Sequence, residues 1–118
     1  MPSVLIIDDS ELILQMLEMV CVQAGFTVHT ATDLDSARQL FEAHGADVVI
    51  TDLNMPGADD PVAAVRAWRD VPVVIVSGQP QADLDAIAAE RGAAGAVSKD
   101  SGMMGMAAAL PDLINHLT

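Results

Sequence analysis

The sequence predicts a single α/β domain: a doubly wound parallel sheet of five strands in the order 2-1-3-4-5, with helices on both faces. Short apolar runs rich in β-branched residues alternate with segments of helical periodicity, and this alternation with short connections is typical of such sheets. Four of the runs end in polar residues, namely Asp8, Asp9, Asp52, Ser77 and Lys99. Ligands of open parallel sheets bind beyond the carboxyl ends of the strands. The two observations together predict one shared site at that edge.

The first unit is a strand over residues 4–7 and a helix that ends at Gly25. Ser10 follows the strand and is a good N-cap, and apolar residues then repeat at helical spacing. Cys21, the one cysteine of the chain, falls on the apolar stripe of this helix. It has no partner for an internal disulfide, so we expect a buried, reduced thiol in a cytoplasmic protein.

The second and third units repeat this pattern. A strand is expected over residues 26–31, followed by an amphipathic helix that ends at Gly45. The next strand covers residues 47–51, and turn residues separate it from its helix. Pro61 is acceptable at the start of that helix, because the first turn has no use for the N–H group that proline lacks.

The fourth and fifth units complete the sheet. A strand over residues 72–76 precedes a helix that ends at Gly92, and the last strand covers residues 96–99. The final helix runs over about residues 103–117. An interior glycine costs a helix about 1 kcal/mol, and an interior proline about 3 kcal/mol, relative to alanine. Because this segment holds a glycine and Pro111, we expect a helix that is kinked, split or locally loose.

Composition limits the possible partners and the location. The chain has 118 residues with 52% apolar content, enough for one core, and we expect one domain over residues 1–118. Its formal net charge is -12, with five Lys and Arg in all. Nucleic-acid binding depends on clustered cations, so we expect no direct nucleic-acid partner. The sequence shows no signal peptide and no apolar run of about 18 residues, so we expect a cytoplasmic protein without membrane association.

The predicted strand order makes the first and third strands neighbours, which brings Asp8, Asp9 and Asp52 together. Crowded carboxylates repel one another, so the cluster needs a nearby cation. Mg2+ is the natural one because it prefers oxygen ligands. Asp52 is then a candidate nucleophile towards phosphorus, while the metal ion and Lys99 neutralise the charge of the transferred group. Ser77 would donate a hydrogen bond to a phosphoryl oxygen.

Four motifs at the strand ends resemble the receiver domains of two-component response regulators, the CheY-like superfamily. The resemblance covers the whole chain, and the motifs occur in the family's order. They are Ile6-Ile7-Asp8-Asp9-Ser10, Val49-Ile50-Thr51-Asp52-Leu53-Asn54-Met55-Pro56-Gly57, Val74-Ile75-Val76-Ser77-Gly78 and Gly92-Ala93-Ala94-Gly95-Ala96-Val97-Ser98-Lys99. The predicted fold corresponds to the flavodoxin-like arrangement of five β/α units.

The resemblance implies a chemistry for the carboxylates. Asp52 receives a phosphoryl group from a sensor histidine kinase or a histidine phosphotransfer protein. Asp9 and Asp52 ligate Mg2+, together with the backbone carbonyl of Asn54 and, usually through water, Asp8. Such a domain is a signalling phosphoacceptor and not an enzyme on other substrates, because it catalyses only its own phosphorylation and dephosphorylation.

The resemblance also implies how the signal leaves the site. On activation Ser77 shifts towards the phosphoryl group, and Lys99 pairs with that group. This motion repacks the surface formed by the fourth helix, the fifth strand and the fifth helix, where a downstream protein binds. The sequence leaves open whether the chain also forms a homodimer through its last helix.

Two departures from the family's pattern concern signal transmission. Asp100 follows Lys99 where the family usually has proline, so we expect a trans peptide bond or an altered loop there. Ala96 stands where many receivers carry an aromatic side chain that swings inward with the Ser or Thr. Without that side chain, a signal has to travel through backbone shifts or helix repacking.

Two other functions stay open. A pseudo-receiver would keep the pocket and act through constitutive protein binding without phosphorylation, as Ala96 and Asp100 suggest. The retention of every phosphoryl-site residue argues against it. A metal-dependent phosphatase or phosphotransferase with an aspartyl nucleophile would commonly need a second Asp two residues after Asp52, where Asn54 stands.

Overall fold

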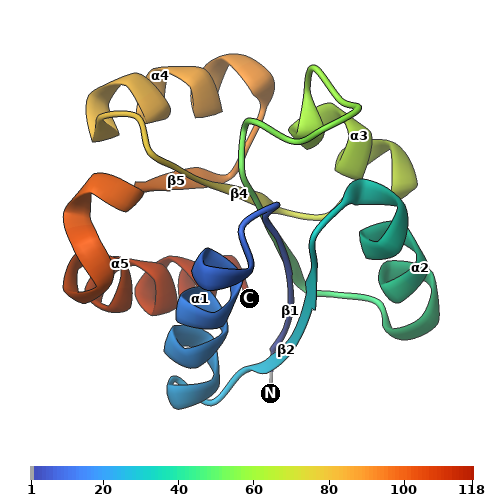
Figure 1. Cartoon of the computed structure of the whole chain (residues 1–118), viewed down its shortest axis with the longest axis horizontal. Coiled ribbons are helices and arrows are strands. Elements are labelled where there is room, and N and C mark those ends of the chain that lie inside the picture. Colours follow the sequence, from blue (N-terminus) through green and yellow to red (C-terminus); the bar gives the residue numbers. More distant parts are fainter. Residues whose placement is uncertain (1) are drawn as a thin grey trace.

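The computed structural model describes residues 2–118, which form one five-strand sheet and five α-helices (Figure 1). The sheet order is β2-β1-β3-β4-β5, and all neighbouring strands are parallel. The strands are β1 (Ser3–Ile7), β2 (Thr27–Ala31), β3 (Val48–Thr51), β4 (Val73–Ser77) and β5 (Gly95–Ser98). The helices are α1 (Glu11–Gln23), α2 (Leu34–His44), α3 (Pro61–Trp68), α4 (Gln81–Arg91) and α5 (Gly102–Leu117). The predicted fold and strand order are confirmed.

Two apolar layers cover the two faces of the sheet. Figure 1 shows α1 and α5 on one side and α2, α3 and α4 on the other. In β1, Val4 and Ile6 pack with the α1 and α5 layer, whereas Leu5 and Ile7 pack with the opposite layer. Both faces of the strand are therefore buried, which explains why it reads as a continuous apolar run. Cys21 is fully buried in the α1 layer, as predicted.

Side-chain caps fix where three helices begin. The side-chain oxygens of Ser10, Asp33 and Asp60 each accept a hydrogen bond from the backbone N–H three residues later. These bonds satisfy N–H groups that have no partner inside the helix. Pro61 lies in the first turn of α3, as predicted. At the other end of α4, Gly92 takes the left-handed conformation with φ of 76° and ends the helix.

The prediction that the last strand includes Lys99 is wrong. β5 ends at Ser98, and residues Lys99–Ser101 form a 3-10 turn that leads into α5. The Ser98 hydroxyl accepts a hydrogen bond from the backbone N–H of Asp100, which turns the chain away from the sheet. The peptide bond after Lys99 is trans, as expected, since residues 2–118 contain no cis peptide bond.

Of the three forms expected for the last helix (kinked, split or locally loose), the split form is not observed. A single α-helix covers Gly102–Leu117 and includes Pro111. Met106, Leu110 and Ile114 follow one another at helical spacing and are all buried against the sheet. This burial holds the helix together across the proline, whose missing N–H group removes one backbone hydrogen bond.

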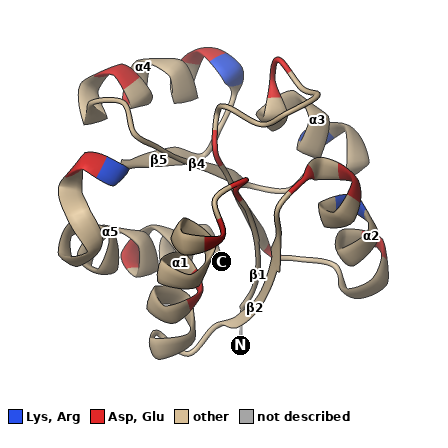
Figure 2. Ribbon diagram, in the orientation of Figure 1, with Lys and Arg blue, Asp and Glu red and all other residues tan. Residues whose placement is uncertain are grey.

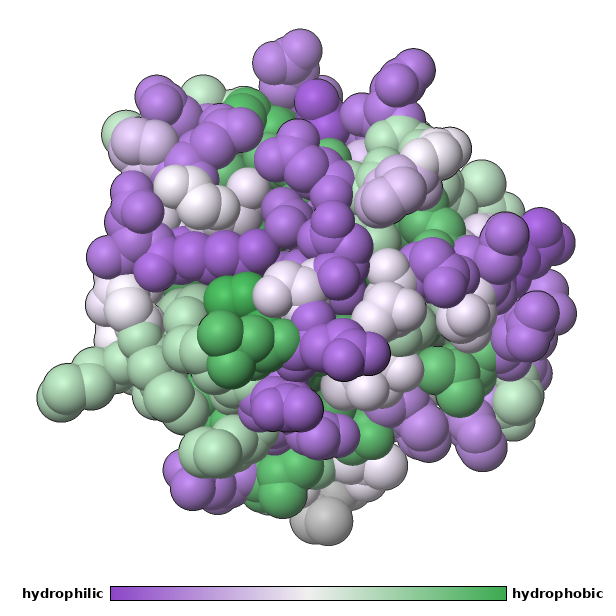
Figure 3. All heavy atoms as spheres, in the orientation of Figure 1, coloured by the Kyte–Doolittle hydropathy of each residue, from purple (hydrophilic) through white to green (hydrophobic). Residues whose placement is uncertain are grey.

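The surface is strongly acidic, and several large apolar side chains are exposed on it. Figure 2 shows acidic residues spread over the molecule and few Lys or Arg. Figure 3 shows apolar side chains at the surface on the side of α1 and α5, and the exposed large apolar residues of the structure lie on these two helices. They are Leu12, Met19, Val22, Met103 and Met104. Within residues 2–118 no helix is both long and apolar enough to cross a membrane.

Candidate functional site

The parallel register of β1 and β3 brings two carboxylates together. Ile7 at the end of β1 pairs with Thr51 at the end of β3, and the backbone N–H of Asp52 donates to the carbonyl of Ile7 at 3.2 Å. Asp8 and Asp52 are the next residues of the two strands, so both leave the sheet at the same point. Both are buried, although they lie 44 positions apart in the chain.

Each oxygen of the Asp52 carboxylate has its own hydrogen-bond partners. Oδ1 accepts from the backbone N–H of Leu53 at 2.7 Å and, with a longer contact, from that of Asn54 at 3.4 Å. Oδ2 lies 2.9 Å from Nζ of Lys99. The backbone fixes one oxygen and a cation faces the other, so the carboxylate is held in one orientation. Charge-assisted bonds of this type are stronger than neutral ones.

Asp8 is held in a similar way from the opposite side of Lys99. Its Oδ1 accepts from the backbone N–H of Ser10 at 2.9 Å, and its Oδ2 lies 2.8 Å from Nζ of Lys99. Burial raises the pKa of Asp8 above its usual value, and the hydrogen bonds from Lys99 and Ser10 oppose that rise. Burial by itself would lower the pKa of Lys99, but the hydrogen bonds to Asp8 and Asp52 outweigh it and raise that pKa. Lys99 is therefore a firmly charged ammonium between two carboxylates.

The donor set suits a hard divalent cation. One carboxylate oxygen each from Asp8, Asp9 and Asp52 can be chosen so that all lie within 4.8 Å of one another, and Asp9 is exposed to solvent. Three carboxylates against the one ammonium of Lys99 leave an excess of negative charge that matches a dication. Oxygen donors around an accessible position are what Mg2+ and Ca2+ bind in proteins. The residues present thus fit the predicted Mg2+ site.

The two remaining predicted site residues lie at the same edge of the sheet. Ser77 is buried at the end of β4, where it pairs in register with Ser98 of β5, and Lys99 follows directly. Asn54 lies two residues beyond Asp52 with an exposed side chain, and its backbone N–H faces Asp52. The structure thus places Ser77, Asn54 and Lys99 at the edge of the sheet that holds the three carboxylates.

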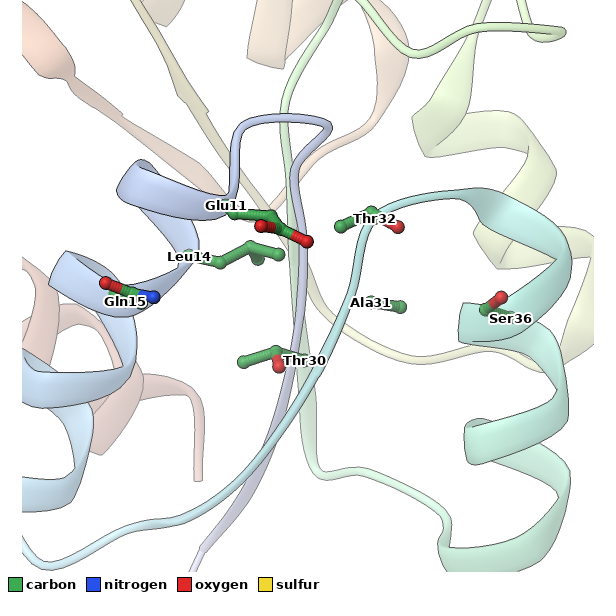
Figure 4. Close-up of a pocket in the computed structure, with 7 residues that line it drawn as sticks. All are labelled: Glu11, Leu14, Gln15, Thr30, Ala31, Thr32 and Ser36. Carbon is green, nitrogen blue, oxygen red and sulfur yellow. The ribbon is translucent and has the colours of Figure 1, made fainter.

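Sequence reasoning missed three features. Backbone N–H groups of Leu53 and Ser10 hold the carboxylates, and no side-chain pattern signals them. A hydrogen bond joins the Gln81 amide to the backbone of Ser98 next to Lys99, and only the three-dimensional neighbourhood of α4 and β5 reveals it. The third feature is a groove of about 460 Å³ along β2, lined by residues of α1, β2 and α2 (Figure 4).

A family model described as "Response regulator receiver domain" matches residues 4–110. The sensory transduction protein RegX3 of Mycobacterium tuberculosis strain H37Rv is 34% identical over 101 residues, covering 84% of this chain and 44% of that protein. The transcriptional regulatory protein PrrA of Mycobacterium leprae is 36% identical over 95 residues, covering 78% of this chain and 41% of that protein. The chain thus spans less than half of the length of these relatives.

Solved structures show the same fold. The chemotaxis response regulator CheY4 of Vibrio cholerae superimposes with a TM-score of 0.79 at 26% identity, covering 96% of this chain and 98% of that one. The signal receiver domain of the putative response regulator NarL from Mycobacterium tuberculosis gives a TM-score of 0.75 at 29% identity, covering 97% and 96% of the two chains. The similarity therefore extends over nearly the whole of each domain.

Proposed function

The chain belongs to the family of response regulator receiver domains, and on that premise we propose that it is the phosphoacceptor of a two-component phosphorelay. Asp52 takes a phosphoryl group from the phosphohistidine of a sensor histidine kinase or a histidine phosphotransfer protein. The observation that carries the proposal is the setting of Asp52. Its Oδ1 is held by the backbone, and its Oδ2 lies 2.9 Å from the Lys99 ammonium beside further carboxylates.

Transfer to Asp52 is a substitution at phosphorus. A carboxylate oxygen forms the new P–O bond while the P–N bond to the donor's imidazole breaks, and the imidazole leaves with the electron pair. Oδ1 accepts backbone N–H bonds from Leu53 and Asn54, whereas Oδ2 faces the ammonium of Lys99. Lys99 beside it neutralises charge that builds up on the phosphoryl oxygens. Mg2+ held by Asp8, Asp9, Asp52 and the carbonyl of Asn54 would add a second positive charge at this point.

Ser77 and hydrolysis complete the proposed cycle. The Ser77 hydroxyl donates a hydrogen bond to a phosphoryl oxygen once the group is in place. Water then hydrolyses the phosphoaspartate and returns the carboxylate, so the domain charges and resets itself and turns over no other substrate. The proposed role is therefore that of a signalling switch, and a phosphatase acting on external substrates is the less favoured alternative because Asn54 replaces the second Asp.

We propose two protein partners, one that donates the phosphoryl group and one that responds to the phosphorylated domain. The phosphohistidine donor docks over the Asp52 edge of the sheet, and a downstream protein binds the face formed by α4, β5 and α5. With a net charge of -12, the domain suits protein surfaces better than nucleic acid. Homodimerisation through α5 and a cytoplasmic location stay predictions of this proposal.

The proposal is tested by intact mass after incubation with Mg2+ and acetyl phosphate. We expect one phosphoryl adduct on the wild type, and none on Asp52→Asn or in the presence of a chelator. Asp59→Asn, an exposed carboxylate of the loop between β3 and α3, is the matched control and should be charged like the wild type. No adduct on the wild type, under conditions that charge an ordinary receiver, would favour the pseudo-receiver alternative.

A further inference from the structure

The side chain of Gln81 binds the free edge of the sheet. Gln81 is the first residue of α4, and its Nε2 donates to the carbonyl of Ala96 at 2.9 Å, while its Oε1 accepts from the backbone N–H of Ser98 at 2.9 Å. The two backbone groups belong to alternate residues of β5, on the side that faces away from β4. One amide thus takes the place of a neighbouring strand.

Ser98 ties a second segment to the same point. Its hydroxyl donates to the carbonyl of Gln79 at 2.6 Å and accepts from the backbone N–H of Asp100 at 3.1 Å. Ser98 is buried, and Lys99 is the next residue. The loop that connects Ser77 to α4 is therefore bonded directly to the strand end that carries Lys99.

From these contacts we propose that Gln81 and Ser98 are positioning residues, and that their hydrogen bonds make the phosphoryl site and the start of α4 move as one unit. We call these contacts the Gln81–Ser98 clamp: the two bonds of the Gln81 amide to β5 and the bond of the Ser98 hydroxyl to Gln79. The proposal rests on the proposed phosphoacceptor function. It assigns the regulation of that site to residues outside it.

The clamp offers a route for the signal that the sequence leaves unassigned. Ala96 has no side chain that could swing on activation, yet its own carbonyl is bonded to Gln81. Ser77 and Lys99 both contact the phosphoryl group in the proposed function. A shift of either residue therefore pulls on the loop or on β5, and the clamp passes that shift to the first turn of α4. The N-cap of this turn, Pro80, makes no side-chain capping bond, so the Gln81 amide is the side-chain hydrogen-bonding group at the start of α4 that reaches β5.

Protection of a bare strand edge does not explain the clamp, because the opposite edge goes without one. Thr27 and Ala31 bond to the β1 side, so Val28 and Thr30 turn their backbone groups outward. Within residues 2–118, no side chain hydrogen-bonds to these outward groups of β2. Figure 4 shows that this edge instead opens into the groove between α1 and α2. The fold tolerates an unpaired edge at β2, so protection of an edge strand does not account for the Gln81 bonds to β5 beside Lys99.

The contacts themselves are tested by amide hydrogen exchange of the unphosphorylated protein. The N–H of Ser98 faces away from the sheet, so its protection depends on Gln81. Gln81→Ala should accelerate exchange at Ser98 by about tenfold, the scale of one lost hydrogen bond. Gln81→Glu keeps the acceptor for Ser98 and loses the donor to Ala96. The Ser98 N–H should therefore exchange more slowly in Gln81→Glu than in Gln81→Ala.

Two control variants separate the clamp from general helix stability. Asp85→Ala removes the other partner of Gln81, an oxygen 2.9 Å away within α4, and leaves the bonds to β5 in place. Gln39→Ala changes an exposed glutamine in the middle of α2. Both should retain the exchange rate of the wild type at Ser98. Equal rates in Gln81→Ala and Gln39→Ala would overturn the clamp.

The coupling is tested with beryllofluoride, which mimics the phosphoryl group, and amide NMR. In the wild type the adduct should shift the amide resonances of the first turn of α4. In Gln81→Ala the adduct should form to the same extent, as read by fluorine NMR, while the α4 shifts fall to less than about half. Full α4 shifts in Gln81→Ala would overturn the coupling alone. Failure of the wild type to form any adduct would overturn the proposed function and the coupling together, and the exchange data would still report on the contacts.

Discussion

Lys99 is the counter-charge of a buried carboxylate: its Nζ lies 2.8 Å from Oδ2 of Asp8, a residue that is 1% exposed. Burial raises the pKa of Asp8, and the hydrogen bond from Lys99 opposes the rise. Lys99→Met removes this opposition, so we expect the pKa of Asp8 to rise further. A carboxyl whose pKa is higher in the folded state than in the unfolded chain stabilises the fold when the pH is below the unfolded-state pKa, which is 3.8 for Asp8. This stabilisation is lost as the pH rises through the folded-state pKa.

Lys99→Met should therefore lose more stability than the wild type between acidic and neutral pH. Breaking a fully buried ion pair costs about 3–5 kcal/mol, and we expect a smaller loss of about 1–2 kcal/mol at neutral pH because the Lys99 side chain is 19% exposed. Urea unfolding at about pH 5 and pH 7.5 measures the difference, and carbon-13 NMR of the Asp8 carboxyl follows its titration. Parallel pH dependences of the two proteins would contradict this account.

Mg2+ should stabilise the folded domain, and Asp9 should be needed for this effect. Asp9 is exposed and makes no hydrogen bond within the described chain, so Asp9→Asn should leave the fold unchanged without Mg2+. At a free Mg2+ concentration ten times the dissociation constant, binding adds about 1.4 kcal/mol to the free energy of unfolding. Thermal unfolding with and without Mg2+ should show this gain in the wild type and in Asp59→Asn, and not in Asp9→Asn. An equal gain in all three would place the ion elsewhere.

Cys21 should make the domain less stable above pH 9. Burial raises the pKa of its thiol to about 12 from 9.0 in the unfolded chain. The unfolded state therefore loses a proton that the folded state keeps, and the free energy of unfolding falls as the pH rises through this window, by about 1.4 kcal/mol per pH unit. Cys21→Ala has no such group, and its small cavity lowers stability equally at each pH. Urea unfolding of both proteins from about pH 8 to pH 10 measures the slopes, and equal slopes would refute the assignment.

The sequence predicts the sheet, and the grouping of Asp8 and Asp52 at its edge, because both depend on local signals. Buried parallel strands must be apolar on both faces, so Val4–Ile7 and Val73–Val76 stand out in the chain. Asp8 and Asp52 follow such runs, and the strand order alone then makes them neighbours. The family comparison supports the same fold over residues 4–110.

Features that depend on contacts between distant segments could not be predicted. His29 and His44 stack with ring centroids 4.4 Å apart, although their spacing in the sequence suggests no relation. Ser98 turns the chain so that Lys99 leaves the strand, and apolar patterning carries no signal for this side-chain-to-backbone hydrogen bond. Helix propensity alone predicts that Pro111 breaks the helix. Propensity does not include the burial of Met106, Leu110 and Ile114 against the sheet, which stabilises α5 across the proline.

Two methionines of α5 provide a matched test of the packing. Met106 is 2% exposed in the layer beneath α1 and α5, whereas Met104 is 88% exposed. Met106→Ala should lower the free energy of unfolding by about 2–5 kcal/mol, because it leaves a cavity in the core. Met104→Ala should change it by less than about 0.5 kcal/mol. Chemical denaturation of both variants tests this, and similar losses at the two positions would mean that α5 packs by another face.

Pro111 should be a site where the domain can be stabilised. It lies inside α5, where a proline leaves the carbonyl of Ala107 without its helical partner. Pro111→Ala restores the N–H donor, and we expect a gain of about 1–3 kcal/mol in the free energy of unfolding, less than the full helix penalty because proline also restricts the unfolded chain. Pro111→Gly restores the same N–H but costs more backbone entropy, so its gain should be about 1 kcal/mol smaller. Urea unfolding measures both, and the beryllofluoride response of α4 serves as a functional control. A loss of stability in Pro111→Ala would show that the packing of Leu110 and Ile114 depends on the local geometry that the proline imposes on the helix.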